Sequence, residues 1–396
     1  MRLSPLSRPA PARRLAACCL AGALAALAGI AHAELPVEQL TMEKLQPPDA
    51  YRIYLSDPAL AHIVDGRTHV VDGASMRYLG LLGTGFAGQT AVSRDQRTLY
   101  VATSYLSRLQ RGTRTDVVEV YSAEDLSLQY EIEIPPKHVQ GLPMRAVMAT
   151  TPDNRFLLVQ NATPATSVTV VDLQAKKVSA EIPTPGCYGV IPWPARPQRF
   201  SSICGDGTLA SYDIDAQGAA AGNRVSAPIF DPDKDPVFMH YEMVGNTLQL
   251  VSYLGALYSV DLSGDEPVAA KPRPMVDAAS ARQGWRPGGY QLFAIEPRSG
   301  RLFVAMHDKG AEGSHKSPAK EIWVIDLKTM KRIARLPGET AVAMAVARTD
   351  KPRLFVLSGA DNRVLSYDIA GARLPAKPAL RSEPFGDMPI YLGLGQ

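Results

Sequence analysis

The sequence lacks the short motifs of several common enzyme classes, and it has few cysteines. No GxSxG, HExxH or P-loop pattern occurs in its 396 residues. These absences argue against an α/β-hydrolase, a zinc protease and a P-loop nucleotide hydrolase. Of the four cysteines, Cys18 and Cys19 lie in a segment that we predict to be removed. Only Cys187 and Cys204 then remain in the mature chain.

Charge of one sign is not in excess, because 42 Lys and Arg balance 39 Asp and Glu. Nucleic-acid-binding domains are commonly basic, with Lys and Arg gathered on one face, so we expect no nucleic-acid partner. Histidines outside the N-terminal segment are scattered. His307 and His315 share one polar segment, but seven residues separate them and no further ligand pattern accompanies them, so we expect no metal site and no catalytic residue in this chain.

The N-terminus has the three parts of a secretory signal peptide. Four arginines precede an apolar run over Leu15–Ile30, and residues 31–33 read Ala-His-Ala, a small-x-small cleavage site. Cleavage after Ala33 predicts export to the periplasm and a mature chain of formal charge −1, and no later apolar run is long enough to span a membrane. A lipobox ending at Cys18 is disfavoured because the apolar core follows it. The pair Arg13-Arg14 leaves the export route open between the general and the twin-arginine pathways.

A strand-like phrase that ends in Asp or Ser and precedes a polar turn recurs seven times, at intervals of 41 to 65 residues. A period of about 40–50 residues built from strands is typical of a β-propeller with one four-stranded blade per repeat. We therefore predict an all-β, seven-bladed β-propeller over residues 51–396, after a signal peptide (1–33) and an N-terminal arm (34–50). The closing aspartates should accept hydrogen bonds from turn amides. The seven phrases are Thr68–Asp72, Val117–Ser122, Val168–Asp172, Leu209–Asp213, Leu257–Asp261, Ile322–Asp326 and Val364–Asp368.

The two remaining cysteines flank a turn between two strand-like runs. In an exported protein this favours a disulfide across a hairpin between Cys187 and Cys204. The alternative is a thiol pair for metal or redox chemistry. That alternative is weaker, because the spacing is not CxxC and no histidine cluster accompanies the pair.

Two insertions interrupt the period, at Val276–Gly289 and Asp308–Lys320. Long insertions in a compact repeat are often functional. Trp285, in the first insertion, and His315 and Lys316, in the second, are therefore candidates for a partner interface. Phe86 is a bulky group in the Gly-rich stretch GTGFAGQ. From the residues alone, simple loop packing explains Phe86 better than a role as a gate or interface anchor.

Five segments of the chain are distinctive beyond the repeat. They are RGTRTDVVEVYSAEDL, GCYGVIPWP, ICGDGTL, GWRPGGYQLFAIEPRSGRLFVAM and GSHKSPAKEIWVIDLKT. These segments resemble the heavy subunit of the bacterial quinoprotein amine dehydrogenases. The resemblance runs over nearly the whole mature chain, and it is most specific in the GWRPGG insertion and in the insertion that contains His315 and Lys316.

The resemblance implies a seven-bladed propeller that pairs with a small light subunit in an α2β2 heterotetramer. The light subunit would carry tryptophan tryptophylquinone, so this chain would hold no cofactor. Primary amines would be oxidised there, and the electrons would pass to a periplasmic blue copper protein of the azurin or amicyanin type. The resemblance also places Phe86 at the aromatic that lines the substrate channel, and Cys187 and Cys204 at the heavy-chain disulfide.

The family has methylamine and aromatic-amine (aralkylamine) versions, and three segments are more similar to the aromatic-amine version. They are IPPKHVQGL (134–142), QNATPATS (160–167) and MHDKGAEGSHK (306–316). We therefore expect an aralkylamine dehydrogenase heavy subunit, with the methylamine version as the alternative. Two other classes compete: a propeller enzyme such as a lactonase, for which no acidic cluster is apparent, and a non-enzymatic periplasmic propeller that serves as a binding scaffold.

Overall fold

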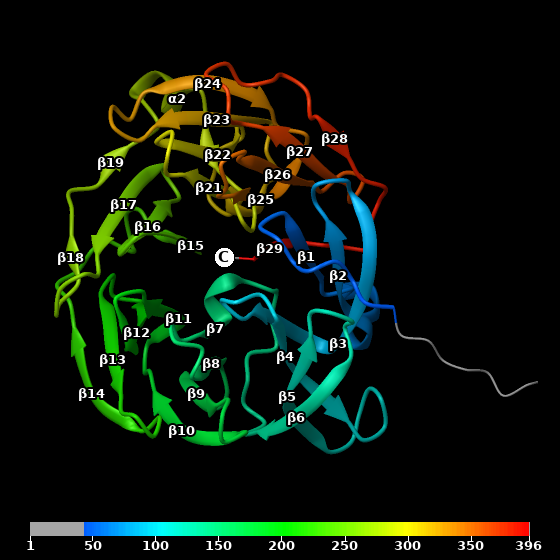
Figure 1. Cartoon of the computed structure of the whole chain (residues 1–396). Helices are drawn as coiled ribbons and strands as arrows, with labels where there is room; N and C mark the ends of the chain where they lie inside the picture. The colour runs from blue at the N-terminus through cyan, green and yellow to red at the C-terminus, as the bar shows by residue number, and fades with distance from the viewer. Residues whose placement is uncertain (1–42, 396) are drawn as a thin grey trace, which may run out of the picture. The chain divides into compact units, whose positions relative to one another are not determined.

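The computed structural model describes residues 43–395, and these are nearly all strand and turn (Figure 1). The predicted signal peptide and residues 34–42 of the predicted arm lie outside the described residues. In the described part, helix is confined to α2 (Ala278–Arg282) and to short 3-10 turns. These turns are η1 (Leu60–Asp65), η2 (Arg145–Val147) and η3 (Ser314–Lys316). No helix within residues 43–395 is long and apolar enough to cross a membrane.

The first sheet has seven strands in the order β29-β1-β2-β3-β4-β5-β6. Its long strand β3 bends at a bulge, pairing with β2 up to Gly85 and with β4 from Phe86 onward. The strands of this sheet are β1 (Arg52–Asp57), β2 (Gly66–Asp72), β3 (Arg77–Val92), β4 (Thr98–Leu106), β5 (Arg114–Ser122), β6 (Leu128–Ile134) and β29 (Tyr391–Leu394).

Two four-stranded antiparallel sheets follow, with orders β10-β9-β8-β7 and β11-β12-β13-β14. The first is built from β7 (Met148–Thr150), β8 (Phe156–Asn161), β9 (Ser167–Asp172) and β10 (Lys177–Pro183). The second is built from β11 (Cys187–Trp193), β12 (Arg196–Cys204), β13 (Leu209–Ile214) and β14 (Ala220–Val225).

The last three sheets have the same plan. In two of them, short strands pair beside the main path. One contains β15 (Val237–Val244), β16 (Thr247–Ser252), β17 (Ala256–Asp261), β18 (Val268–Ala269) and β19 (Arg273–Pro274). The next contains β20 (Arg286–Pro287), β21 (Phe293–Glu296), β22 (Arg301–His307), β23 (Glu321–Asp326) and β24 (Arg332–Pro337). The last contains β25 (Ala341–Ala347), β26 (Arg353–Ser358), β27 (Val364–Asp368) and β28 (Leu380–Arg381).

The recurring phrase predicted from the sequence is a strand in all seven places, namely β2, β5, β9, β13, β17, β23 and β27. Five closing aspartates accept a hydrogen bond from a turn amide, as predicted: Asp72, Asp172, Asp261, Asp326 and Asp368. The prediction was wrong for Asp213. Its carboxylate instead accepts hydrogen bonds from the guanidinium groups of Arg199 and Arg224, at 2.5 and 2.7 Å, because two basic side chains flank it on adjacent strands.

Within residues 44–395 the sheets lie side by side around a centre, where β29 and the first strands of the other sheets meet (Figure 1). The two ends of the chain meet in one sheet, because β29 pairs with β1. An apolar core fills the space between neighbouring sheets, and one cluster joins Ile53 and Leu55 of the first sheet to Phe355 and Leu357 of the last. This all-β arrangement of mainly four- and five-stranded sheets is consistent with a β-propeller.

Candidate functional site

Phe86 lies at the bulge where β3 leaves one partner strand for the other. The residues on either side of it are left-handed: Gly85 has φ of 57° and Ala87 has φ of 52°. Position 88 requires glycine because the backbone of Thr84 lies too close for a side chain: an added Cβ would lie 1.9 Å from the Thr84 carbonyl oxygen. We call residues 85–88 the Phe86 bulge. Phe86 itself is partly exposed and pairs with buried Ser104 of β4, so the backbone fixes its position while its surface stays accessible.

The stretch Gly83–Gly88 reads GxGxxG, a pattern that in dinucleotide-binding folds joins a strand to a helix N-terminus. Here it lies inside strand β3 and continues as strand. It therefore lacks the helix N-terminus that would bind a pyrophosphate, and we assign it no nucleotide-binding role.

The segment 134–142, one of the three that resemble the aromatic-amine version, packs beside the Phe86 bulge. The Gln89 amide donates a hydrogen bond of 2.9 Å to the carbonyl oxygen of Gly141. The Gln140 amide donates one of the same length to Ser104 Oγ. The segment also meets residues 160–167, because the amide of Val139 donates to the carbonyl of Gln160. Two of the three segments thus lie next to each other, and one of them lies beside the Phe86 bulge.

A buried charged network holds this segment in place. Asp116 is fully buried and accepts hydrogen bonds of 2.6 Å from Ser104 Oγ, from two nitrogens of Arg114 and from His138 Nδ1. Burial raises the pKa of the Asp116 carboxyl, but these hydrogen bonds outweigh it and lower the pKa to about 2. Asp116 is therefore ionised at neutral pH and ties β4, β5 and the 134–142 segment together.

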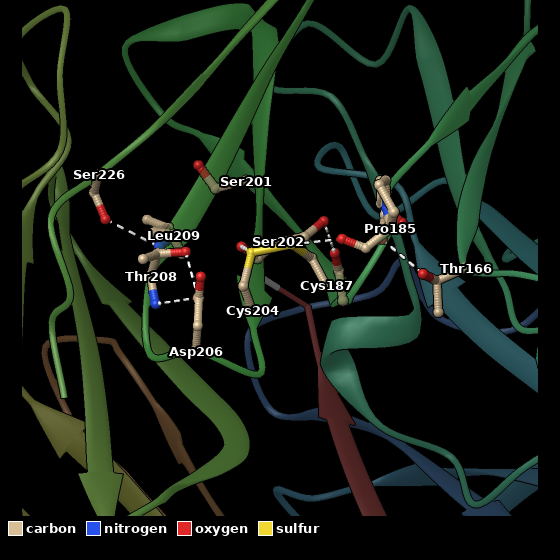
Figure 2. Close-up of a disulfide and its surroundings, with 12 residues drawn as sticks. Thr166, Pro185, Cys187, Ser201, Ser202, Cys204, Asp206, Thr208, Leu209 and Ser226 are labelled. Atoms are coloured by element: carbon tan, nitrogen blue, oxygen red, sulfur yellow. Dashed lines mark hydrogen bonds between the residues drawn. A yellow bond between two sulfur atoms is a disulfide. The ribbon is translucent and has the colours of Figure 1, made fainter. Parts of the chain in front are cut away.

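The predicted disulfide is present and joins adjacent strands at the start of β11 and the end of β12 (Figure 2). Cys187 and Cys204 are direct partners in the strand register. Both are nearly buried, at 6% exposure each. The turn that follows is closed by Asp206, which accepts hydrogen bonds from the amide and hydroxyl of Thr208 (Figure 2). The pair therefore staples the β11–β12 hairpin.

The structure places Trp285 mostly inside the chain. It is 7% exposed, and its ring lies 5.3 Å from that of Trp323, centroid to centroid. The charged groups of Lys320 and Arg335 lie 5.9 and 5.7 Å from the ring centroid. Its principal contacts are therefore within its own sheet, and its role at a partner interface stays a prediction.

His315 and Lys316 lie in η3, on the second insertion. The carbonyl of His315 accepts a hydrogen bond from the amide of Gly289, so the two insertions are packed together. The His315 ring stacks on Tyr253 at a centroid distance of 4.9 Å. Burial lowers the pKa of His315, and the charge of neighbouring Lys316 lowers it further. Lys316 is exposed, and the interface role of both residues stays a prediction.

Within residues 43–395, no group of three or more His, Cys, Asp or Glu side chains is arranged to hold a metal ion. The carboxylates of Asp116 and Asp206, described above, accept their hydrogen bonds from protein groups.

Comparison with known families identifies the chain. A family model described as "Methylamine dehydrogenase heavy chain (MADH)" matches residues 49–377, which is most of the sequence. The chain belongs to the methylamine dehydrogenase heavy-chain family. It is therefore a heavy subunit of an amine dehydrogenase, and the resemblance inferred from the sequence is confirmed at that level.

Relatives in this family match the heavy chain along most of its length. The methylamine dehydrogenase heavy chain of Methylorubrum extorquens is 30% identical, over 90% of this chain and 89% of that one. The Paracoccus versutus heavy chain is also 30% identical, over 82% of this chain and 75% of that one.

Solved structures with low sequence identity share the fold of the heavy chain. A putative 6-phosphogluconolactonase from Bacteroides uniformis is similar, with a TM-score of 0.60, 11% identity and coverage of 87% of this chain and 99% of that one. Hydrazine synthase of Kuenenia stuttgartiensis is similar, with a TM-score of 0.53, 15% identity and coverage of 84% and 99%. At these identities the likeness concerns fold alone.

Sequence reasoning missed the support beneath the Phe86 bulge in this heavy chain. Asp116, His138 and Gln140 are far from Phe86 in sequence and form no motif, so no pattern announces that they meet. A useful signal was the placement of a charged residue, Asp116, directly before the apolar pair Val117-Val118 of a strand, where burial requires a partner.

Proposed function

We propose that this chain is the heavy subunit of a periplasmic, tryptophan tryptophylquinone-dependent aralkylamine dehydrogenase. In this proposal it is a seven-bladed propeller that supports a light subunit and lines the channel by which a primary aromatic amine reaches it. The products are an aldehyde and ammonia, and a blue copper protein of the azurin or amicyanin type takes the electrons. The partner assembly is an α2β2 heterotetramer.

The proposed count of seven blades rests on treating β3 as two strands. Its first half then completes a sheet with β29, β1 and β2, and its second half begins one with β4, β5 and β6. Each of the resulting seven groups contains one recurring phrase. The pairing of β29 with β1 joins the two ends of the described chain in one sheet. This pairing fits a closed ring of blades, an arrangement that leaves only short, protected sheet edges.

The observation that carries the functional proposal is the Phe86 bulge and its support. In a chain of this family, an accessible aromatic held by two left-handed residues and a buried network suits a channel wall. Such a wall would select amines by the apolar contact it offers. One extra or missing methylene in a hydrophobic pocket changes kcat/KM by about 10- to 200-fold, and we expect the loss of ring contacts to have an effect of this order.

The preference for aromatic amines is supported by where the distinguishing segments lie. Residues 134–142 are linked to the Phe86 bulge through the Gln89 amide, which donates to the carbonyls of both Gly141 and Ala87, and residues 160–167 contact 134–142 in turn. Features that separate the two versions thus lie beside the proposed channel. The methylamine version is the second candidate, since the family model and the curated relatives carry that name.

The light subunit would supply tryptophan tryptophylquinone, which oxidises the amine when present. The role of this chain is to position that subunit and to exclude water from the substrate path through Phe86 and its neighbours. Trp285, His315 and Lys316 are the proposed contacts outside the channel. A non-enzymatic periplasmic scaffold is the remaining alternative, and it predicts no activity in any assembly.

The test is to co-express the chain with a small, Cys-rich light subunit of this family and to purify the complex from the periplasm. We expect a higher kcat/KM for phenylethylamine than for methylamine with a dye acceptor. A preference for methylamine would favour the second candidate. A stable complex that oxidises neither amine would contradict the proposal.

A further inference from the structure

A cavity of about 290 Å³ lies at the centre of the sheets, where their innermost strands end. Strand β3 contributes Thr90–Val92 to its wall, followed by Arg94, whereas Phe86 lies at the opposite end of the same half-strand. The cavity is therefore separate from the proposed substrate channel. Its volume is near the lower limit of the 300–1,000 Å³ that is usual for small-molecule sites.

Three arginines from three separate elements reach this cavity. Arg94 follows β3, Arg145 lies in η2 and Arg348 follows β25. Two of the three arginines pair with the buried carboxylate of Glu242 on β15. Arg145 Nη1 lies 3.3 Å from Glu242 Oε2, and Arg348 forms an ion pair with the same oxygen. Burial raises the pKa of Glu242, but Arg145 and Arg348 outweigh it and lower the pKa, so the carboxyl is ionised.

The positive charge at the cavity is not fully balanced. Burial lowers the pKa of adjacent His240 to about 4, so this ring is neutral at pH 7. Three guanidinium groups and one carboxylate therefore leave two positive charges. The charge of Asp153 also reaches Arg94 from the neighbouring turn, but this carboxylate accepts hydrogen bonds from Thr151 and the Arg155 amide and does not line the cavity.

Arg94 is an exposed residue at the rim of the cavity, and its guanidinium group has unused hydrogen-bonding capacity toward the protein. Its side chain forms no hydrogen bond and no ion pair with any of residues 43–395. Burial lowers the pKa of Arg94; Tyr241 opposes this effect, and the like charge of Arg145 adds to it. A group of this kind is stabilised by a negative charge that arrives from outside the chain.

Two tyrosine hydroxyls at the cavity also lack partners in the described chain. Tyr241 is 4% exposed and Tyr391 is partly buried, and both line the cavity. Neither hydroxyl forms a hydrogen bond with residues 43–395. The guanidinium carbon of Arg145 lies 5.4 Å from the Tyr241 ring centroid, which keeps this hydroxyl-bearing ring within the arginine cluster. A hydroxyl at the cavity wall that has no protein partner can donate a hydrogen bond to a ligand oxygen.

We propose that the axial cavity binds a small oxyanion with two negative charges, either a phosphate or a dicarboxylate. Guanidinium forks match the geometry of both groups, and the charge of such a ligand equals the excess on the cavity wall. The ligand bridges Arg94, Arg145, Arg348 and Tyr391, so it ties β29 to the ends of other innermost strands. Binding therefore stabilises the closed ring.

The test titrates the purified full chain with sodium phosphate in one arm and sodium succinate in the other, by calorimetry and by thermal unfolding. Sodium chloride at equal ionic strength is the reference. We expect saturable binding of at least one dianion and a Tm that rises with its concentration. The stronger arm distinguishes a phosphate site from a dicarboxylate site.

Variants identify the site. Arg94→Gln should weaken binding about 10- to 100-fold, the usual effect of removing a hydrogen bond to a charged group. Tyr391→Phe, which keeps the ring, should weaken it less. Arg97→Gln removes the same charge from the same exposed turn, but Arg97 does not line the cavity, so this variant should leave the affinity unchanged.

Two results would overturn the proposal. One is the absence of saturable binding by either dianion beyond the chloride reference. The other is equal weakening by Arg94→Gln and Arg97→Gln, which would indicate general charge attraction. Amine oxidation is not a readout of this test, so its outcome is independent of the function proposed above.

Discussion

Phe86 is fixed by its backbone more than by its side chain. Left-handed Gly85 and Ala87 flank it, and the hydrogen bond from Gln89 to Gly141 fastens the bulge to the next segment. Truncating the ring should therefore leave the backbone geometry intact while removing apolar contact from the proposed channel. This makes Phe86 a suitable residue for separating selectivity from stability.

In the assembled enzyme, Phe86→Ala should change the ratio of kcat/KM for phenylethylamine over methylamine by about 10- to 200-fold, equivalent to about 1–3 kcal/mol. Thermal stability should change little, since a partly exposed residue leaves a small cavity. Leu109→Ala is the matched control, because Leu109 is an exposed apolar residue on the loop after β4. An unchanged ratio in Phe86→Ala, with normal assembly, would make Phe86 a packing residue only.

Asp116 should make stability depend on pH in a defined direction. Its folded-state pKa of about 2 lies below the unfolded value of about 3.9, so its stabilisation is complete above about pH 4 and is lost as the pH falls toward 2. Asp116→Asn should cost about 2–3 kcal/mol at neutral pH, and this cost should fall by about 1 kcal/mol at pH 3.

Urea unfolding of Asp116→Asn and the parent chain between pH 3 and pH 7 measures this difference. Asp233→Asn, which alters an exposed carboxylate, should show no comparable pH dependence. If the cost of Asp116→Asn were the same at both ends of the range, the charge of Asp116 would not be the stabilising feature.

At the scale of elements, the strands were predictable because their signal is local. Alternating apolar residues and a closing Asp occur within a few positions, and all seven recurring phrases are strands. The β11–β12 staple was predictable for a similar reason, since two cysteines flank one turn. Asp213 shows the limit of such reasoning: its partners come from adjacent strands, and their side chains outcompete the turn amide.

The contacts between elements were not predictable, because they join residues far apart in sequence. Gln291 is an example. Its side chain donates to the carbonyl of Leu392 at 3.0 Å and accepts from the Leu392 amide at 2.8 Å, so it joins the β20–β21 connection to β29. At 4% exposure this contact is shielded from water.

Gln291→Ala should therefore destabilise the ring closure. It leaves the amide and the carbonyl of Leu392 without partners, at a cost of about 1–3 kcal/mol for each buried group. We expect a loss of about 2–4 kcal/mol in urea unfolding. Gln198→Ala, at an exposed position, is the control and should be near neutral. Equal stability of the two variants would show that closure does not depend on Gln291.

At the scale of the whole molecule, the family could be identified from sequence, whereas the axial arginine cavity could not. Family segments such as GWRPGG are contiguous and can be compared directly. Arg94, Arg145 and Arg348 come from three separate sheets or their connections, and only the folded chain brings them to one cavity. For the same reason, the sequence did not predict that Asp116, His138 and Gln140 support the Phe86 bulge.

The central claim is a division of labour, in which this chain supports catalysis and the light subunit performs it. The direct measurement compares the purified chain alone with the chain co-purified with its light subunit, by visible absorbance and by phenylethylamine oxidation with a dye acceptor. The account predicts no quinone absorbance and no turnover for the chain alone, and both for the complex. Turnover by the isolated chain would contradict it, as would a stable complex that oxidises no primary amine.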